Sequence, residues 1–455
     1  MNGVTVYEFD VLVPAESGAL DSAGLVGVPP GVFDWLDMQC LRASEAGGAT
    51  WLQRTQRRGR PAIQVTSYVG VIRAPDDYQI EVLPKVGRVA GSTAEDARKL
   101  LIDMLRCLPG FRHIQTLNAH LAAARMPLLE VFVREFLLAV ERVVKRGLRS
   151  DYTAQQDNVT ALRGKLLFAE NLRQNLCRAD RFFTEHDTFS SNRPENRLLH
   201  AALRRVLVLC TSQPNQQLAR ELCNVFADVP ATTRVAQDFQ QVRMDRGMGS
   251  YADALAWARI VLENESPLTG MGAYRAPSLL FPMEAVFEAF VARHLGRKLR
   301  PPLVLQSQAC GHHLVNHRSQ NWFWLKPDLL VREGSKTRVV LDTKWKLLDH
   351  SSASGTDKYG LSQADFYQLY AYGQTYLDGT GDLVLVYPRT ERFTDPLPVF
   401  EFPKAQGLRL WVLPFCLRTR VLHIPQEAPF ADCFDGAGLF QKSSTGLFSS
   451  PLAVG

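Results

Sequence analysis

The sequence predicts a multidomain α/β protein, with a β-rich N-terminal domain, a helical middle region and a C-terminal α/β domain built on a mixed sheet. Three observations predict this architecture. The chain has 455 residues, which is too long for one hydrophobic core. Strand-like alternation dominates the first stretch of about 115 residues, and helical spacing dominates from about 126 to 265. From 278 onward, helical and strand-like runs follow in the order α-β-β-β-α-β-β.

The N-terminal domain is assigned to residues 1–120. "VTVYEFDVLV" (4–13) alternates like one strand, and "AIQVTSYVGVIRAPDDYQIEVLPKVG" (62–87) predicts a hairpin that turns at Pro75-Asp76-Asp77. "TAEDARKLLIDMLRCL" (93–108) predicts a helix, because Thr93 can act as N-cap and acids fill the first turn.

Basic residues of this domain suggest contacts with an acidic partner. "QRTQRRGRP" places Arg54, Arg57, Arg58 and Arg60 in a predicted loop before the hairpin. They are candidates for binding DNA phosphates or an acidic protein surface, and a solvated loop accounts for them equally well. Lys85, at a strand end, is either a partner-docking residue or a turn residue.

The middle domain, 121–275, reads as mainly helical. "PLLEVFVREFLLAVERVVKRGL" (127–148) has apolar residues at helical spacing and ends at Gly147. Similar spacing predicts helices in "NRLLHAALRRVLVLC" (196–210) and "SYADALAWARIVLE" (250–263), and "LTGMGAYRAP" (268–277) reads as a linker.

The C-terminal α/β domain is assigned to 276–425, followed by a Gly/Ser-rich tail, 426–455, which is expected to be mobile. Its predicted helices are 282–299 and 362–377, and its predicted strands are 303–308, 321–331, 338–345, 382–388, 397–402 and 408–415. Parallel and antiparallel neighbours are both needed to join these elements, so a mixed sheet is expected.

Composition describes a soluble protein of a reducing compartment. Hydrophobic residues make up 46% and charged residues 22% of the chain, and the net charge is +6, which suits either a polyanionic partner or simple solvation. The eight cysteines include no C-x-x-C pair, so they read as reduced core residues of a cytoplasmic protein. No export signal and no membrane-spanning run is recognised.

A carboxylate–lysine arrangement in the C-terminal domain predicts a metal site. Asp342 and Lys344 are two apart in an apolar strand, so both project to one face. Asp328 follows Pro327 at the end of the preceding strand. The two acids and the Thr343 carbonyl supply oxygen ligands for a divalent cation. Lys344 is then placed to orient or deprotonate a water, or to stabilise negative charge; a half-buried Asp–Lys pair is the alternative.

Two neighbouring helices offer further site residues. Gln368 and Tyr372 are four apart and share a helix face, so Gln368 is predicted to act near the metal and Tyr372 to contact DNA. An aromatic core stripe is the competing interpretation. Glu284 and Glu288 are also four apart, and Glu288 is favoured as the acid that completes the metal shell, against the alternative of a solvated acid.

These residues resemble the PD-(D/E)xK nuclease superfamily. Pro327-Asp328 and Asp342-Thr343-Lys344 stand in its motif positions, and Gln368 to Tyr372 is similar to the Q-x-x-x-Y element of its RecB-like branch. The resemblance covers roughly 280–415. It implies a restriction-endonuclease-like fold and a metal-dependent DNA nuclease.

A second resemblance narrows the class. "SYVGVIRAPDDYQIEVLPKVG", "ALRGKLLFAENLRQN", "FFTEHDTFSSNRPENRLLHAAL", "FEAFV", "KPDLLV", "LDTKWK" and "DFYQLYAYG" resemble the McrC family, in the right order across most of 60–415. The resemblance implies the nuclease subunit of an McrBC-type restriction complex, which cleaves modified, methylcytosine-containing double-stranded DNA with Mg²⁺, or with Mn²⁺ in its place. It also implies a partner, an McrB-like AAA+ GTPase ring, on which the N-terminal domain docks.

One independent observation agrees with a separate motor. The chain has no G-x-x-x-x-G-K-[ST] loop, since Val159 stands where the first glycine is required before Gly164-Lys165. We therefore expect no nucleotide to bind this chain itself, and no membrane partner. Two alternatives remain open: a stand-alone RecB-like repair or processing nuclease, and an inactive adaptor that only regulates the motor.

Overall fold

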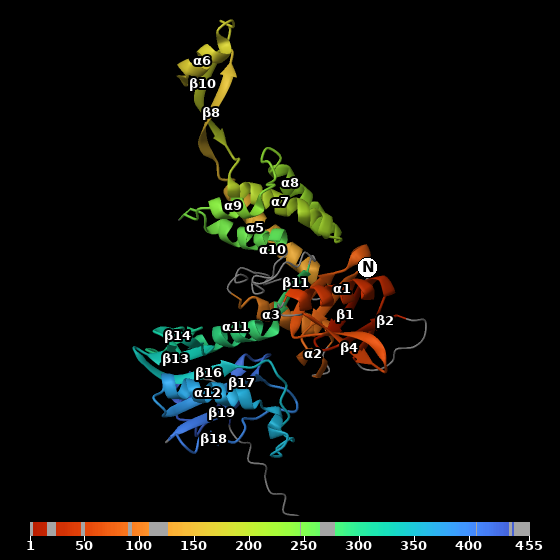
Figure 1. Cartoon of the computed structure of the whole chain (residues 1–455), viewed down its shortest axis with the longest axis vertical. Helices are drawn as coiled ribbons and strands as arrows, with labels where there is room; N and C mark the ends of the chain where they lie inside the picture. The colour runs from red at the N-terminus through yellow and green to blue at the C-terminus, as the bar shows by residue number, and fades with distance from the viewer. Residues whose placement is uncertain are drawn as a thin grey trace, which may run out of the picture.

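The architecture described here comes from a computed structural model of the chain. It describes residues 3–15, 24–46, 51–89, 93–108, 126–245, 247–263, 278–405, 407–435 and 439–440. The predicted linker 268–277 lies outside these residues. The molecule is elongated: the N-terminal and C-terminal α/β units lie side by side at one end, a helical bundle follows, and a slender arm extends beyond it (Figure 1). The predicted multidomain α/β class is confirmed.

The N-terminal unit contains two small sheets. Its elements are β1 (Gly3–Tyr7), β2 (Val11–Pro14), β3 (Leu25–Val28), α1 (Pro30–Ala46), β4 (Leu52–Arg57), β5 (Arg60–Val65), β6 (Tyr68–Arg73), η1 (Pro75–Asp77), β7 (Gln79–Leu83), α2 (Val86–Val89) and α3 (Ala94–Leu105). One sheet has the order β3-β2-β5-β4 and the other β1-β7-β6-β11. The predicted hairpin at Pro75 is confirmed as β6–η1–β7, and Thr93 caps α3 in a capping box with Asp96.

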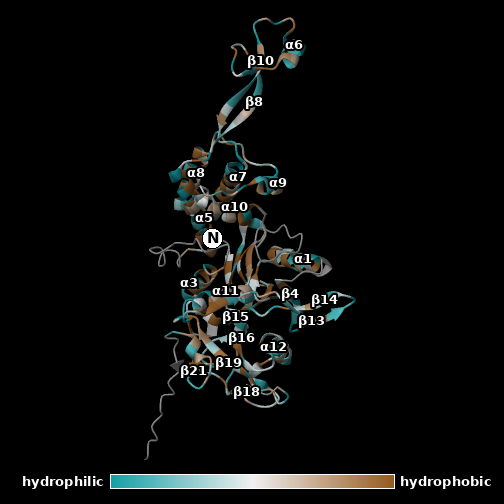
Figure 2. Cartoon of the chain, turned by 90° about the vertical axis from the view of Figure 1, so that its left-hand side faces the viewer, coloured by the Kyte–Doolittle hydropathy of each residue, from teal (hydrophilic) through white to brown (hydrophobic). Residues whose placement is uncertain are grey.

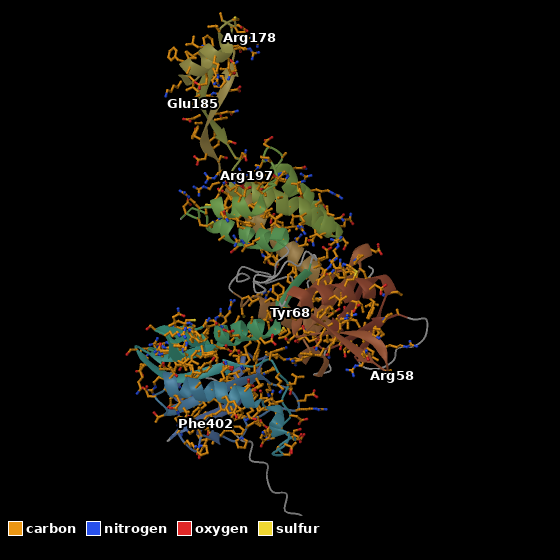
Figure 3. All side chains as sticks on the ribbon, viewed as in Figure 1. Arg58, Tyr68, Arg178, Glu185, Arg197 and Phe402 are labelled. Atoms are coloured by element: carbon orange, nitrogen blue, oxygen red, sulfur yellow. The ribbon has the colours of Figure 1, made fainter. Side chains whose placement is uncertain are left out.

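Two predictions for this unit are wrong. The run 4–13 forms two strands in different sheets, because the backbone turns at Phe9, whose φ is +68°. The arginine segment is the β4–β5 hairpin and not a loop, with Arg58 (φ +52°) and Gly59 (φ +74°) at its turn. Arg58 lies at the outer end of this hairpin (Figure 3). Polar residues on both faces had concealed the strand period.

The middle region packs as a bundle of α5 (Leu128–Arg146), α7 (Pro194–Leu209), α8 (Gln213–Val225), α9 (Val235–Gln241) and α10 (Gly249–Glu263). The helix ending at Gly147 is confirmed. Fully buried Phe136, Phe226 and Trp257 fill its core. Large apolar side chains at helical spacing therefore hold the helices together.

Part of the middle region, which was predicted to be mainly helical, is a β arm. It consists of β8 (Asp151–Val159), β9 (Lys165–Leu166), α6 (Phe168–Asn175) and β10 (Phe182–Ser190), with the sheet order β8-β10-β9. Glu185 lies along the arm and Arg178 near its tip (Figure 3). The β8 sequence, "DYTAQQDNV", has too few apolar residues to show a strand period, so no strand was predicted here.

The C-terminal unit is built on a seven-stranded mixed sheet. Its elements are β11 (Ser278–Pro282), α11 (Met283–Gly296), β12 (Val304–Ser307), β13 (His312–His317), β14 (Gln320–Leu325), β15 (Leu329–Glu333), β16 (Lys336–Thr343), η3 (Lys358–Gly360), α12 (Gln363–Tyr376), β17 (Gly381–Pro388), β18 (Phe400–Glu401), β19 (Leu408–Cys416), β20 (Val421–Leu422), β21 (Ile424–Pro425), η4 (Ala431–Cys433) and β22 (Leu439–Phe440). The order is β12-β15-β16-β17-β19-β18, with β20 paired to β19. β16, β17 and β19 are parallel, whereas β12, β15 and β16 are antiparallel.

Helices cover both faces of this sheet. On one face α11 packs on Val339 and Leu341, and on the other α12 packs on Val340 and Leu383. Figure 2 shows hydrophobic residues along these strands. The predicted run 321–331 divides at Pro327, because β14 pairs only with β13 in a separate hairpin. Residues 426–435, assigned to the tail, contribute buried Phe430 and Phe434 to the core.

The sheets of the two α/β units are joined by the chain itself. β11 pairs antiparallel with β6 of the N-terminal sheet, and α11 begins directly after it. Met283 N donates to Ser67 O at 2.9 Å. The helix that carries Glu284 and Glu288 is therefore fixed to the N-terminal unit at its first residue.

Candidate functional site

The alternation of β16 decides which side chains face the site. Val340, in the same strand, points toward α12, so Asp342 two residues later points to the same side. Asp342 is 2% exposed, and Lys344 follows just beyond the strand end. The predicted same-face pair is confirmed by an ion pair of 2.7 Å between Lys344 Nζ and Asp342 Oδ2.

Asp328 is held against the end of the same strand. Thr343 donates to Asp328 Oδ2 through its backbone N at 2.8 Å and its Oγ1 at 2.7 Å. The N–H and C=O of one strand residue point to the same neighbour, so the Thr343 carbonyl is also directed toward the Asp328 side. Pro327 lies on that side and has no backbone N–H that could donate to the Thr343 carbonyl.

Lys344 is surrounded by acceptors from α12 as well. Its Nζ lies 3.2 Å from Gln368 Oε1 and 3.5 Å from Asp365 Oδ1. Burial alone would lower the pKa of Lys344, but the Asp342 carboxylate and the nearby Asp365 and Asp328 raise it. Lys344 is therefore a positively charged ammonium at neutral pH.

Tyr372 holds the Gln368 side chain in place by a hydrogen bond. Gln368 Nε2 donates to the Tyr372 hydroxyl at 2.8 Å, and that hydroxyl donates to the Lys326 carbonyl at 3.0 Å. Tyr372 is 3% exposed, so its ring is part of the core. The predicted DNA contact of Tyr372 stays a prediction that this placement does not favour, whereas Gln368 lies at the site as expected.

Gly373 explains how α12 comes this close. A Cβ at this position would lie 2.7 Å from Leu408 Cδ2 and 3.2 Å from Leu383 Cδ1. A side chain here would have to displace these leucine methyl groups, so glycine lets α12 lie close to the sheet without such a shift. The approach brings Gln368 to Lys344.

The acids of the site influence one another. Burial and, after it, the charge of Asp328 raise the pKa of Asp342 to about 6. Burial also raises the pKa of Glu288 to about 7, with added contributions from Asp328 and Asp342. Gln308 Nε2 donates to Glu288 Oε1 at 2.5 Å. The acid predicted to complete the metal shell therefore lies near both other acids.

The donor set fits a hard divalent cation. Lys344 reaches Asp342 Oδ2 as an ion pair, yet this buried oxygen accepts no well-directed hydrogen bond among the described residues. Asp328, Asp342, Glu288 and the Thr343 carbonyl are oxygen donors of the kind that Mg²⁺ prefers. Within the described ranges, however, no three His, Cys, Asp or Glu side chains are already spaced to hold a metal. A bound cation would have to draw the acids together.

Two residues of the site were missed from sequence. Asp365 ion-pairs with Lys344 and accepts from the Tyr387 hydroxyl at 3.4 Å, and Gln308 joins Glu288 to Asp328, whose carbonyl accepts from Gln308 N at 2.9 Å. The spacing of Asp365 to Gln368, three residues on one helix, was an available signal. Nothing in the sequence near Gln308 indicated its position.

The predicted basic contacts lie elsewhere. Arg54 pairs with Asp37 at 2.7 Å, and Arg57, Arg58 and Arg60 are exposed on the β4–β5 hairpin, away from the acids. Lys85 is half-buried and donates from Nζ to the Trp345 carbonyl at 3.0 Å. Lys85 thus joins the N-terminal unit to the residue after Lys344, and its predicted docking role stays a prediction.

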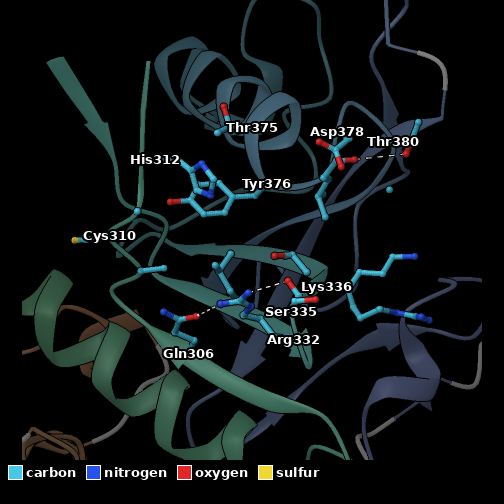
Figure 4. A pocket seen from close by; sticks show the side chains of 17 residues that line it. Gln306, Cys310, His312, Arg332, Ser335, Lys336, Thr375, Tyr376, Asp378 and Thr380 are labelled. Atoms are coloured by element: carbon cyan, nitrogen blue, oxygen red, sulfur yellow. Dashed lines mark hydrogen bonds between the residues drawn. The ribbon is translucent and has the colours of Figure 1, made fainter. Parts of the chain in front are cut away.

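Two cavities lie in the C-terminal unit. One, of about 690 Å³, is lined by Arg332, Lys336, His312 and Tyr376 and includes none of the site acids (Figure 4). Another, of about 720 Å³, is lined by Glu288 together with Arg293 and Arg297 of the same helix. The second cavity therefore places positive charge on the helix face that carries Glu288.

These features define a class: a multidomain α/β protein with an acid–acid–lysine set at one end of a mixed sheet. In solved structures, a chain of the refined half-complex from the tetradecameric assembly of Thermococcus gammatolerans McrB AAA+ hexamers with bound McrC has the same fold, with a TM-score of 0.63 at 20% identity, over 91% of this chain and 95% of that chain. A chain of the cryo-EM structure of the Thermococcus gammatolerans McrBC complex matches at 21% identity and a TM-score of 0.46, over 65% of this chain and 88% of that chain.

The sequence pattern of one family matches residues 63–388, well over half of the chain: McrBC 5-methylcytosine restriction system component. The chain belongs to this McrBC family, and the resemblance to McrC predicted from sequence is confirmed. No curated protein matches the chain. Among the described residues, no helix has the length and apolar character needed to cross a membrane.

Proposed function

We propose that the chain is the DNA-cleaving, McrC-type subunit of a modification-dependent restriction complex. Its C-terminal domain would act as a PD-(D/E)xK nuclease on methylcytosine-containing double-stranded DNA, and its N-terminal domain and arm would bind an McrB-like AAA+ GTPase ring and stimulate it. The observation that carries the proposal is the convergence of Asp328, Asp342, Lys344 and Gln368. Eight free cysteines are consistent with the cytoplasm.

The proposed metal ligands are Asp328, Asp342, Glu288 and the Thr343 carbonyl. When bound there, Mg²⁺, or Mn²⁺ in its place, would activate water and neutralise charge on the phosphate. The chain's own residues do the rest. Asp342 holds Lys344 at the site, and Gln368 fixes the direction of the ammonium.

The role proposed for Lys344 follows from its position. Its ammonium group is held between Asp342 and Gln368, where it can donate to the attacking water or to the phosphate oxygens. Among the roles considered from sequence, we favour this donation over proton abstraction. Asp365 supports the same charge at 3.5 Å.

Reconstitution with an McrB-type GTPase tests this function. Methylated DNA should be cut only with GTP, Mg²⁺ and both proteins, and unmethylated DNA should survive. Asp342→Asn and Lys344→Ala should each lower cutting by at least a hundredfold, because each removes a group that the reacting phosphate needs. GTP hydrolysis by the partner should still be stimulated.

Asp382→Asn provides a matched control, because Asp382 is another buried acid of the sheet and lies away from the site. It forms an ion pair with Arg409 at 3.0 Å. It should keep the cutting rate of the folded fraction. Cutting of DNA by the purified chain without a partner would instead favour the stand-alone nuclease. Stimulation of the partner without cutting under any metal would favour the adaptor.

A further inference from the structure

The β13–β14 hairpin exposes aromatic side chains directly beside the candidate site. Trp322, Phe323 and Trp324 are 44%, 67% and 50% exposed, and Leu314 and Val315 on the facing strand are 55% and 42% exposed. The hairpin pairs with no other described strand. Isolated two-stranded hairpins are marginal in water, and a contiguous apolar patch on a surface usually marks a binding site.

The hairpin that carries these aromatic rings contains no acidic residue. No Asp or Glu occurs from Val304 to Pro327, whereas Arg318 and Lys326 carry permanent positive charges and three histidines lie in β13. His317 packs on Trp322 with ring centroids 4.7 Å apart, and His313 on Trp324 at 5.8 Å. Cations beside exposed rings form the combination that holds a nucleic-acid strand, since phosphates pair with the cations and bases stack on the rings.

Both ends of the hairpin are tied to the site. At one end, Gln308 contacts Glu288 and the Asp328 carbonyl. At the other, Tyr372 and Tyr376 donate from their hydroxyls to the carbonyls of Lys326 and Leu325, at 3.0 and 2.8 Å. Lys326 is only two residues before Asp328. A strand that stacks on the hairpin is therefore held close to the candidate metal ligands.

Figure 4 shows a further contact between the base of the hairpin and α12. His312, at the start of β13, lies against Tyr376 of α12, with ring centroids 4.7 Å apart. Together these contacts join the hairpin base to the helix that carries Gln368. The tip, with Arg318 and Ser319 both at positive φ, projects beyond them.

We propose that the β13–β14 hairpin binds single-stranded nucleic acid by stacking bases on Trp322 and Trp324, and so holds an unpaired strand beside the cleavage site. Binding of the strand does not depend on the proposed nuclease function, but its role in cleavage rests on that function. A second copy of the chain is a poorer occupant, because two such surfaces would bring Arg318 and Lys326 of both copies together with no carboxylate on the hairpin to pair them.

Binding of a fluorescein-labelled oligothymidylate to the full chain in EDTA tests the proposal, with fluorescence anisotropy as the readout. Trp322→Ala and Trp324→Ala should each weaken binding about tenfold, and Trp324→Tyr should restore most of it, because tyrosine also stacks. Arg318→Gln should reduce the dependence of affinity on salt by about one phosphate contact. Phe189→Ala, which removes an exposed ring of the arm (64%), should leave binding unchanged.

The outcomes separate this proposal from the nuclease function. Wild-type chain that does not bind the oligonucleotide, or tryptophan variants that bind it as wild type does, would overturn the hairpin proposal even if the complex cuts DNA. Loss of binding in these variants would uphold it even if no cutting is found. Tryptophan variants that change only self-association in sedimentation velocity would assign the surface to a second copy and overturn the proposal.

Discussion

Two groups of buried charged residues meet at the neighbouring residues Lys344 and Trp345, directly after β16. Lys344 and its acids form the first group. The second contains Glu8, which accepts from Trp345 Nε1 at 2.9 Å and from Lys85 N at 3.0 Å. Neighbouring residues thus face different partners: Lys344 points to the candidate site, and Trp345 to the N-terminal unit.

Glu8 makes the stability of the chain depend on pH. Burial raises the pKa of Glu8 from 4.5 to about 7, although Lys85 opposes the change. Between these values the unfolded chain loses a proton that the folded chain retains, so the free energy of unfolding falls as pH rises, by about 3 kcal/mol in all. Glu8→Gln cannot titrate and should gain stability relative to wild type over this range.

Thermal unfolding at pH 5 and pH 7.5 would measure the effect. The advantage of Glu8→Gln over wild type should be larger at the higher pH. Glu221→Gln changes an exposed glutamate of α8 and should show no such trend. Parallel curves for Glu8→Gln and wild type would contradict the assigned role of burial.

Sequence spacing was sufficient for residues of one strand and insufficient for contacts between elements. The alternation of β16 predicted that Asp342 and Lys344 share a face. Asp328 was assigned to the end of one strand, 321–331, whereas that run divides at Pro327 and Asp328 lies just before β15. Gln308 and Asp365 reach the site from a loop and a helix start, and their positions depend on how α11 and α12 pack on the sheet. Local patterns carry no information about that packing.

Among the elements, the arm exposes several large apolar side chains. Its tip carries Leu162, Phe168, Leu172 and Leu176, which are 59%, 72%, 62% and 79% exposed. The fold of the tip does not rely on these side chains, since α6 is tied to the strands by Asn171, which accepts from Phe183 N at 2.8 Å. Large exposed apolar side chains on a separately braced element favour a protein contact.

Leu172→Asp should therefore weaken association with the GTPase ring about tenfold or more and remove most GTPase stimulation. A charge at this position opposes burial in an apolar interface. Pull-down and GTP turnover measure the loss, and oligonucleotide binding should stay intact. Gln174→Asp, which adds the same charge to an exposed polar position of α6, is the matched control. Equal effects of both variants would place the contact elsewhere.

The elements that sequence predicted well are rich in buried apolar residues. α3, α5, α11 and α12 bury one face at the helical period, and β17 and β19 are continuous apolar runs that are buried on both faces. Strand β8 of the arm is exposed along most of its length, so no strand period marks it. In the β4–β5 hairpin Leu52, Ile63 and Val65 are buried, but the polar residues of β4 hide the strand period.

Over the whole molecule, the N-terminal unit and the candidate site are connected by two routes. β11 adds a strand to the N-terminal sheet and leads into α11, which carries Glu288. Trp345 adds a second connection, because its indole N donates to both Glu8 oxygens, at 2.9 and 3.0 Å, directly after Lys344. Motion of the N-terminal unit on a partner would therefore reach the site residues through α11 and through Trp345, which lie on the same face of the sheet.

Trp345→Phe tests the second connection. The variant keeps an aromatic ring against Phe287, 5.3 Å away between centroids, but removes the donor to Glu8. We expect a loss of about 1–3 kcal/mol in stability, because the buried Glu8 carboxyl group would lose the hydrogen bonds that Trp345 donates. We also expect partner-stimulated cutting to fall at least several-fold while GTP hydrolysis is still stimulated. The reason is that movement of the N-terminal unit would no longer be transmitted to the site through the Trp345–Glu8 hydrogen bonds.

Trp411→Phe separates coupling from stability. Trp411 is also buried and donates from Nε1 to a buried acid, Asp382, at 2.8 Å, but this pair lies within the C-terminal sheet. Both variants should lose similar stability, whereas only Trp345→Phe should lower the ratio of DNA cuts to GTP hydrolysed. An equal fall in that ratio for both variants would mean that stability alone explains the loss, and the connection through Trp345 would carry no signal.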